Sequence, residues 1–478
     1  MAKFYITTTL PYVNAEPHIG FALEIIQADT IARYHRLLGD DVIFNFGTDE
    51  HGLKIYQKAL EAKKSPQEYC DEYAAKFDAL KKALNLSYTN FIRTTDKHHV
   101  EAAQKFWEIC KTNDDIYKKQ YKIKYCVGCE LEKTDSELVD GKCPLHPKLE
   151  IQIYEEENYF FRFSKYQKQL LTLYKKNPEF VVPNSKLNEI RIFVEQGLQY
   201  FSISRLKAKM PWGIDVPDDP DHVMYVWFDA LINYISTIGW PKDLKHFKEY
   251  WPVVQFAGKD QVRQQAAMWQ AMLMSANLPS SKQIVIHGFL TVDGQKISKS
   301  LGNTIDPIKE ADKYGTDALR YYLLAKVHPW EDSDFSWAKF RETYNADLAN
   351  GLGNLIARVA KLCETNDLDY TETKQPSKKL PLSLEIAGYR THLENYQFNL
   401  ALEEIWKEIK TLDGRLSEEK PWLKSGEEVK QLLKEYVRQI TDIAYALQPF
   451  MPETAEKILT QFKGPKITSE KPLFPRLG

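Results

Sequence analysis

Apolar strands alternate with an amphipathic helix at the start of the chain, and this order restricts the fold more than any other feature of the sequence. Residues 4–10 are typical of a buried strand, residues 20–38 repeat apolar side chains at helical spacing, and residues 42–46 form a second apolar run. Gly39 matches the usual C-terminal stop of a helix. This order favours a parallel sheet that binds ligands at the carboxyl ends of its strands.

The alternation is interrupted between residues 115 and 222 and then resumes. Further strands are expected at Met224–Phe228 and Val253–Gly258. We therefore predict one α/β, Rossmann-type domain, made of residues 1–114 and 223–290 and split by an insertion at 115–222.

The rest of the chain has a different pattern. Residues 291–337 connect the α/β domain to a C-terminal part, and after residue 338 the strand signals fade. Helical periodicity dominates there, in residues 342–363, 397–413, 427–448 and 452–462. We predict that residues 338–478 form an α-helical bundle.

The charge balance of the whole chain does not indicate a polyanionic partner. Lys and Arg total 64, Asp and Glu total 66, and the formal net charge is −2. Contacts with nucleic acid would therefore use local basic patches. One cluster is either such a patch or an ordinary solvated face: Lys118, Lys119, Lys122 and Lys124. No stretch approaches the roughly 18 apolar residues of a membrane span, so we expect a cytoplasmic protein without a membrane segment.

Four metal-ligand residues cluster within the interruption. Cys126-x2-Cys129 and Cys143-x2-His146 supply three thiolates and one imidazole, a set that suits tetrahedral zinc. The alternative is four unrelated reduced side chains. If all four bind one ion, no position remains for an activated water. The pattern therefore predicts one structural zinc ion per chain.

Two segments far apart in the chain suit a polyphosphate. Pro17–Phe21 lies between the first strand and its helix, where His18 and free backbone N–H groups can donate to phosphate. Gly294–Asn303 is a loop with two cations and two hydroxyls, from Lys296, Ser298, Lys299 and Ser300. Either segment alone is more often a surface turn, whereas the pair in this order predicts a site that splits ATP.

Both segments resemble the His-Ile-Gly-His and Lys-Met-Ser-Lys-Ser signatures of class I aminoacyl-tRNA synthetases. From Tyr5 to about Phe450 the sequence is similar to the methionyl-tRNA synthetases, although Phe21 replaces the second histidine of the first signature. The resemblance implies a catalytic domain, a zinc knuckle in the insertion and a helical anticodon-binding domain. It also implies activation of methionine by magnesium-bound ATP to methionyl-adenylate and pyrophosphate, followed by transfer to the terminal adenosine of tRNA(Met).

The resemblance assigns roles to individual residues at the nucleotide end. His18, Lys296 and Lys299 are the expected catalytic residues, because they would stabilise charge that moves onto the departing phosphates. The expected ATP-binding residues are His18, Gly20, Phe21, Lys296, Ser298, Lys299 and Ser300. Since Phe21 cannot donate a hydrogen bond, a variant active site is implied.

The resemblance also implies a pocket for methionine, whose thioether favours an aromatic lining. Asp49 would hold the substrate ammonium. The expected methionine-binding residues are Leu10, Tyr12, Asp49, Trp227, Tyr234 and Trp269. On spacing alone such aromatic residues would more often be core. Gln264 and Gln265 stand where many relatives have Phe-His, which predicts a more polar pocket.

Three residues of the C-terminal part resemble the anticodon-reading site of the family. Asn354 and Arg358 are spaced i, i+4 on one helical face, and Trp422 offers a stacking surface for an unpaired base. Alternatively, Asn354 and Arg358 share a surface hydrogen bond and Trp422 is core. A monomer is expected, because the chain ends soon after Met451-Pro452, without the further domain that makes some relatives dimers.

Four alternative functions fit the sequence less well. Cysteinyl enzymes use zinc at the substrate, whereas these ligands lie in the insertion, and leucyl, isoleucyl and valyl enzymes carry a much longer inserted editing domain. Phe21 raises the alternative of a non-catalytic tRNA-binding factor, against which Lys296 and Lys299 argue. An adenylyltransferase would leave the helical C-terminal part unexplained.

Overall fold

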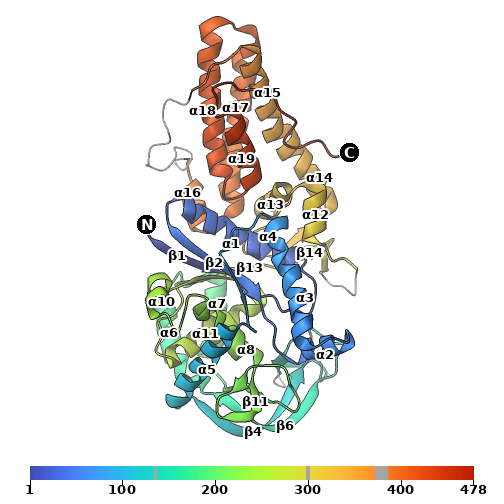
Figure 1. Ribbon diagram of the computed structural model, residues 1–478, viewed down its shortest axis with the longest axis vertical. Helices are drawn as coiled ribbons and strands as arrows, with labels where there is room; N and C mark the ends of the chain where they lie inside the picture. The colour runs from blue at the N-terminus through green and yellow to red at the C-terminus, as the bar shows by residue number, and fades with distance from the viewer. Residues whose placement is uncertain (134–136, 298–301, 372–385) are drawn as a thin grey trace.

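The computed structural model describes residues 1–133, 137–297, 302–371 and 386–478. Figure 1 shows an elongated molecule in which the α/β part lies at one end and a bundle of long helices at the other. Within the described residues, no helix is long and apolar enough to cross a membrane.

Six parallel strands form the main sheet, in the order β3-β2-β1-β12-β13-β7. Their bounds are Lys3–Thr7 (β1), Asp41–Thr48 (β2), Asn90–Arg93 (β3), Val181–Val182 (β7), Val254–Gly258 (β12) and Gln283–His287 (β13). β1 pairs with β2 on one side and with β12 on the other. The two parts of the sequence that flank the interruption therefore meet at the centre of one sheet, which confirms the predicted parallel α/β fold.

Helix α1 (Ile19–Leu37) carries the chain from β1 back to β2 and is buried along most of its length. The ring of His18 caps its N-terminus by accepting from the N–H of Gly20. Gly39 follows its C-terminus with φ of +88°, as the sequence predicted. The other helices of the first part are α2 (Leu53–Glu61), α3 (Pro66–Asp78), α4 (Leu80–Ala83) and α5 (Lys97–Thr112).

The strand predicted at Met224–Phe228 is wrong beyond its first residue. Strand β11 (Asp219–Met224) ends there and pairs antiparallel with β9 and β10 outside the main sheet. Val226–Ala230 is the short helix α8. The end of β11 and most of α8 are buried, and a short apolar run cannot distinguish a buried strand from a buried helix turn.

The interruption consists mainly of two antiparallel sheets. One has the order β5-β4-β6-β8 and the other β10-β11-β9. The bounds are β4 (Ile116–Cys126), β5 (Leu131–Glu132), β6 (Gln152–Phe161), β8 (Phe201–Ser202), β9 (Ser204–Leu206) and β10 (Asp215–Val216). Lys118, from the candidate basic patch, forms a 2.7 Å ion pair with Asp219. β6 places Glu155–Glu157 opposite Gln120–Lys122, so acidic residues balance this lysine-rich strand.

The interruption also returns to the main sheet before it ends. Helices α6 (Gln167–Lys176) and α7 (Asn184–Glu195) flank β7, which pairs with β13 as the edge strand. After the interruption follow α9 (Asn233–Ser236), α10 (Leu244–Tyr250), the π-helix η4 (Gln264–Met268) and α11 (Trp269–Ser275). The interruption is therefore not a separate domain throughout, because its strand β7 belongs to the main sheet.

The C-terminal part is helical, as predicted. Small strands β14 (Leu290–Val292), β15 (Gln295–Lys296) and β16 (Ser333–Phe335), with helices α12 (Pro307–Tyr314) and α13 (Thr316–Ala325), connect it to the sheet. The helices that follow are α14 (Trp337–Thr343), the π-helix η6 (Tyr344–Gly353), α15 (Asn354–Thr365), α16 (Tyr389–Glu394), α17 (Phe398–Glu419), α18 (Gly426–Leu447) and α19 (Pro452–Gln461).

A buried ion pair joins the α/β part to the bundle. Arg320 of α13 has no exposed side-chain surface and lies 2.9 Å from Asp29 of α1. The same guanidinium donates to the carbonyls of Pro449 and Phe450, in the turn before α19. Burial is the largest influence on Asp29 and would raise its pKa. The charges of Arg320 and Arg33, together with hydrogen bonds from Ser87 and Arg33, outweigh burial and lower that pKa. Asp29 therefore remains ionised at neutral pH.

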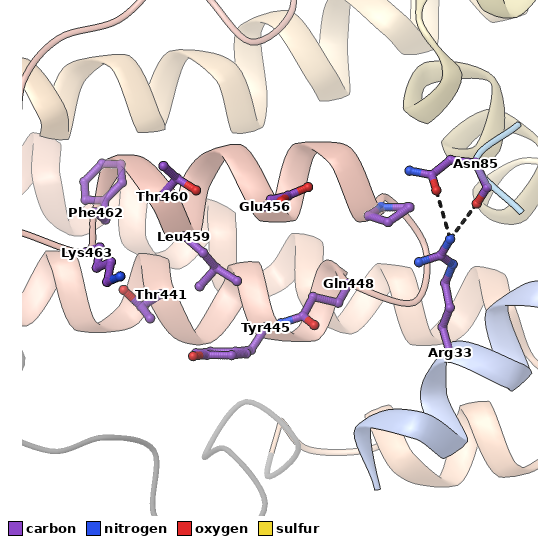
Figure 2. A pocket seen from close by; sticks show the side chains of 11 residues that line it. Arg33, Asn85, Thr441, Tyr445, Gln448, Glu456, Leu459, Thr460, Phe462 and Lys463 are labelled. Atoms are coloured by element: carbon purple, nitrogen blue, oxygen red, sulfur yellow. Dashed lines mark hydrogen bonds between the residues drawn. The ribbon is translucent and has the colours of Figure 1, made fainter. Parts of the chain in front are cut away.

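A cavity of about 530 Å³ lies next to this joint. Figure 2 shows Arg33 of α1 at one end of the cavity, where its guanidinium donates to Asn85. Side chains of α18 and α19 form the rest of the lining, among them Tyr445 and Glu456.

We expect Arg320→Met to lower the free energy of unfolding by about 3–5 kcal/mol, because it removes one of the two guanidinium partners of the buried Asp29 and leaves the buried carbonyls of Pro449 and Phe450 without their donor. Urea titration measures the change. Lys361→Met is the matched control, since the Lys361–Glu364 pair is exposed and should contribute less than about 1 kcal/mol. Equal losses in the two variants would contradict the importance of the buried pair.

Candidate active site

A cavity of about 280 Å³ opens at the carboxyl ends of the central strands, where the parallel sheet predicts a ligand. Thr9 to Tyr12 line it after β1, Asp49 after β2 and Asp260 after β12. Residues of α8 and α9 form a further wall. Segments that are far apart in the sequence therefore meet around one space.

The structure brings most of the predicted methionine-binding residues to this cavity. The lining includes Leu10, Tyr12, Asp49, Trp227 and Tyr234. Trp269 does not line it: the indole is fully buried, stacks on Phe106 with ring centroids 5.9 Å apart, and supports Tyr234 from behind. Trp269 thus stands in the core.

Asp49 is a buried acidic group on the cavity wall. Its Oδ1 has no hydrogen-bond partner among the described residues. Burial, followed by the negative charge of Asp229, raises the pKa of Asp49. A buried carboxyl oxygen with no partner is costly unless a ligand satisfies it, and a cationic ligand would also favour its ionised form.

The two glutamines that replace the Phe-His pair take different places. Gln265 lines the cavity, and its side-chain amide forms hydrogen bonds with Gln255 at 2.9 Å and with the hydroxyl of Tyr234 at 2.8 Å. Gln264 is buried outside the lining, and its Oε1 has no partner among the described residues. The cavity therefore has a polar back wall held by a hydrogen-bond chain.

The first signature segment meets the second one at Gly20. A Cβ on Gly20 would lie 2.9 Å from the ring of His18 and 3.8 Å from Cδ1 of Ile297. Glycine at this position therefore makes room for the capping histidine. Phe21 lines the cavity and packs its ring against His18, with centroids 4.4 Å apart.

Lys296 is exposed in β15, at the start of the second segment. Its backbone carbonyl accepts from the side chain of Asn303 at 3.0 Å. Burial raises the pKa of Asp260 on the cavity wall, and the charge of Lys296 partly opposes this rise. Ser298, Lys299 and Ser300 lie outside the described residues.

The four predicted metal ligands form one cluster. The ligand atoms of Cys126, Cys129, Cys143 and His146 all lie within 4.8 Å of one another. The sulfur of Cys129 is 3.4 Å from that of Cys143 and 3.2 Å from Nδ1 of His146. Three sulfurs and one imidazole nitrogen at such spacing fit a tetrahedral ion with bonds of about 2.0–2.3 Å. The unrelated-residue alternative does not explain this convergence.

Sequence reasoning missed two residues between this cluster and the cavity. The carboxylate of Glu130 accepts from the hydroxyl of Tyr12 at 3.2 Å and from the backbone N–H of Lys54 at 2.8 Å. Glu130 and Lys54 both line the cavity. The available signal was the position of Glu130 directly after the ligand Cys129.

The three candidate anticodon residues lie on the helical bundle. Asn354 is exposed at the start of α15. Arg358 pairs with Asp413 at 2.6 Å rather than with Asn354, and its guanidinium lies 5.9 Å from the ring of Trp422. The side chain of Trp422 is 50% exposed, so it is not a core residue.

Comparison with known proteins gives matches along the whole chain. The family model described as tRNA synthetases class I (M) matches residues 4–152 and 148–360, and the anticodon-binding domain of tRNA ligase matches residues 382–477. The methionine–tRNA ligase of Thermotoga maritima is 42% identical, over 95% of this chain and 74% of the relative. That of Thermosynechococcus vestitus is 43% identical, over 96% of this chain and 89% of the relative.

The chain belongs to the methionyl-tRNA synthetase family. Enzymes of this family are class I ligases that activate methionine with ATP and charge tRNA. A solved structure of the Mycobacterium tuberculosis methionyl-tRNA synthetase with methionyl-adenylate matches with a TM-score of 0.91 and 36% identity, covering 100% of both chains. The free-state structure of that synthetase matches with a TM-score of 0.84 and 33% identity. The resemblance to methionyl-tRNA synthetases is thus confirmed, and the other synthetase families are excluded.

We expect the purified protein to carry a metal ion at this cluster and Cys143→Ser to lose it, because a serine hydroxyl does not ionise at neutral pH and is a poor ligand for a soft-ligand site. Metal analysis by mass spectrometry gives the content per chain. Cys110→Ser is the matched control, since Cys110 is a buried free thiol outside the cluster. Full metal content in Cys143→Ser would contradict the assignment.

Proposed function

We propose that this chain joins methionine to tRNA(Met) in two steps at the 280 Å³ cavity. The observation that carries the proposal is the meeting of Asp49, the aromatic wall and the first signature segment at the carboxyl ends of β1, β2 and β12. Membership of the methionyl-tRNA synthetases supplies the reaction, and the geometry supports an assignment of roles to residues.

Asp49 is proposed to hold the methionine ammonium. Its unpartnered Oδ1 is buried, and an ammonium beside it would offset the cost of ionising a buried carboxyl group. Leu10, Tyr12, Trp227 and Tyr234 surround the space next to Asp49 and would enclose the thioether side chain. Trp269 acts only through Tyr234.

ATP is proposed to lie between the two signature segments, with Mg²⁺ on its phosphates. The methionine carboxylate attacks the α-phosphorus, a P–O bond forms, and the bond to the leaving pyrophosphate breaks. His18, Lys296 and Lys299 would stabilise the charge that develops on the pyrophosphate. Gly20, Phe21, Ser298 and Ser300 complete the proposed nucleotide-binding set. Phe21 offers an apolar ring against His18 instead of a second donor.

The Cys3His cluster is proposed to hold one structural zinc ion. Its donor set is that of closed zinc sites, and all four ligands come from the protein. Zinc would fold the turn that carries Glu130, whose carboxylate fixes Tyr12 of the pocket.

Recognition of the anticodon is proposed for Asn354, Arg358 and Trp422. Exposed Trp422 lies next to the Arg358 guanidinium, so a base could stack on the indole beside a cation. A monomer in the cytoplasm and the boundaries 1–114, 115–222, 223–290, 291–337 and 338–478 stay predictions.

Methionine-dependent exchange of labelled pyrophosphate into ATP is the direct test of the first step. We expect exchange with methionine among the twenty amino acids. Lys296→Ala should lower the rate by about 10²–10³, because it removes a donor to the developing charge. Lys361→Ala, on the exposed face of α15, is the matched control. Folded, metal-loaded protein that shows no exchange with any amino acid would overturn adenylation and favour a non-catalytic tRNA-binding factor.

Trp422→Ala should weaken binding of tRNA(Met) about 5- to 150-fold while pyrophosphate exchange stays unchanged, because stacking of one base contributes about 1–3 kcal/mol. Titration with tRNA measures the change. Leu423→Ala is the matched control, since Leu423 is the neighbouring exposed apolar residue. Equal affinity of Trp422→Ala and the unsubstituted protein would count against the anticodon assignment.

A further inference from the structure

A second polar centre lies behind the cavity without lining it. It consists of Asp229, His51, His99 and Ser236, and we call it the Asp229 cluster. The buried carboxylate of Asp229 accepts from Nδ1 of His51 at 2.6 Å and from Nε2 of His99 at 2.8 Å. The other ring nitrogen of His99 lies 3.0 Å from the hydroxyl of Ser236. Both carboxylate oxygens therefore have partners.

Three members of the Asp229 cluster each follow a cavity residue by two positions. The pairs are Asp49 and His51, Trp227 and Asp229, and Tyr234 and Ser236. They come from the loop after β2, from α8 and from α9, while His99 adds α5. One carboxylate thus connects the separate elements that carry the proposed ammonium ligand and two walls of the methionine pocket.

The charge of Asp229 makes this connection strong. Burial alone would raise its pKa, but His51 first and then His99 outweigh burial and lower it. Asp229 is therefore ionised at neutral pH, and its hydrogen bonds to the two imidazoles are charge-assisted. Removing any one bond would leave a buried polar group unsatisfied, which is more costly than losing a surface contact.

The loop that carries Asp49 is held from its other side as well. Glu50 accepts from Arg93 at 2.6 and 2.9 Å, and its backbone N–H donates to Thr94. Glu50, the residue after the proposed ammonium ligand, therefore has hydrogen-bond partners for its side chain and its backbone N–H, whereas Asp49 keeps one buried oxygen without a partner among the described residues. This arrangement is that of a preorganised binding group supported by residues behind it.

We propose that Asp229 is a positioning residue for the amino-acid substrate, which fixes Asp49, Trp227 and Tyr234 relative to one another through His51, His99 and Ser236. Asp229 does not touch the substrate. The inference rests on the proposed function of the cavity and deepens it. Substitution of a residue that only stabilises the fold would affect the binding of methionine and of ATP alike.

The first test is Asp229→Asn in the full chain. The amide keeps one acceptor oxygen but places an NH2 group where the second imidazole N–H needs an acceptor, so we expect methionine to bind about tenfold more weakly. Isothermal titration with methionine alone gives the Kd, and pyrophosphate exchange gives the KM for methionine and for ATP. The KM for ATP should stay within about twofold. The matched control is Asp317→Asn, which removes another buried carboxylate, bonded to the N–H of Thr454 far from the cavity.

A second pair of variants tests the same role if Asp229→Asn does not fold. His99→Gln keeps a side-chain donor for Asp229 and should leave the KM for methionine near that of the unsubstituted protein, whereas His99→Leu should raise it. An unchanged KM for methionine in both Asp229→Asn and His99→Leu, or equal changes for methionine and ATP, would overturn the positioning role. Absence of methionine-dependent exchange in the unsubstituted protein would instead overturn the proposed function, and this inference with it.

Discussion

The parallel pairing of β1 with both β2 and β12 is the constraint on which the rest of the structure depends. β1 takes its second partner from beyond the whole interruption, so the sheet exists only when the two parts of the chain have met. The carboxyl ends of these strands then deliver Leu10, Asp49 and Asp260 to one cavity. The excursion carries the cysteine cluster and returns to the same sheet through β7.

Buried ion pairs fix the positions of helices and loops around this sheet. Asp29 and Arg320 attach helix α1 to the helical bundle, and Asp229 attaches the loop of Asp49 to α8 and α5. Each carboxylate is ionised because basic groups offset the cost of its burial. Such pairs contribute little net stability compared with apolar packing, but removing one partner is costly, so they favour one arrangement of the elements. The α/β part and the bundle are therefore joined by specific geometry as well as by apolar contact.

Sequence patterns gave correct predictions for features that depend on residues close together in the chain. Gly39 at the end of α1, the helices of the bundle and the four-ligand metal cluster needed only short-range rules of periodicity, capping and ligand spacing. The pattern failed at Tyr225–Phe228, because a short apolar run is equally compatible with a strand and with the buried helix α8. The family resemblance assigned Trp269 to the methionine pocket; in the structure its indole does not line the cavity and packs on Phe106 next to Tyr234. The signal for Glu130 was limited to its position directly after the ligand Cys129, and Lys54 had none, because neither residue belongs to a recognisable motif.

The sequence by itself determined the chemical inventory: a parallel α/β domain, a soft-ligand metal cluster, two signature segments and the methionyl-tRNA synthetase family. These follow from residue types and short spacings, which the chain carries before it folds. Only the tertiary structure decided which groups touch. It placed Gly20 against Ile297, paired Lys118 with Asp219, and put Asp229 between His51 and His99. Such contacts join residues far apart in the chain, and their geometry depends on the packing of whole elements, which no local pattern encodes.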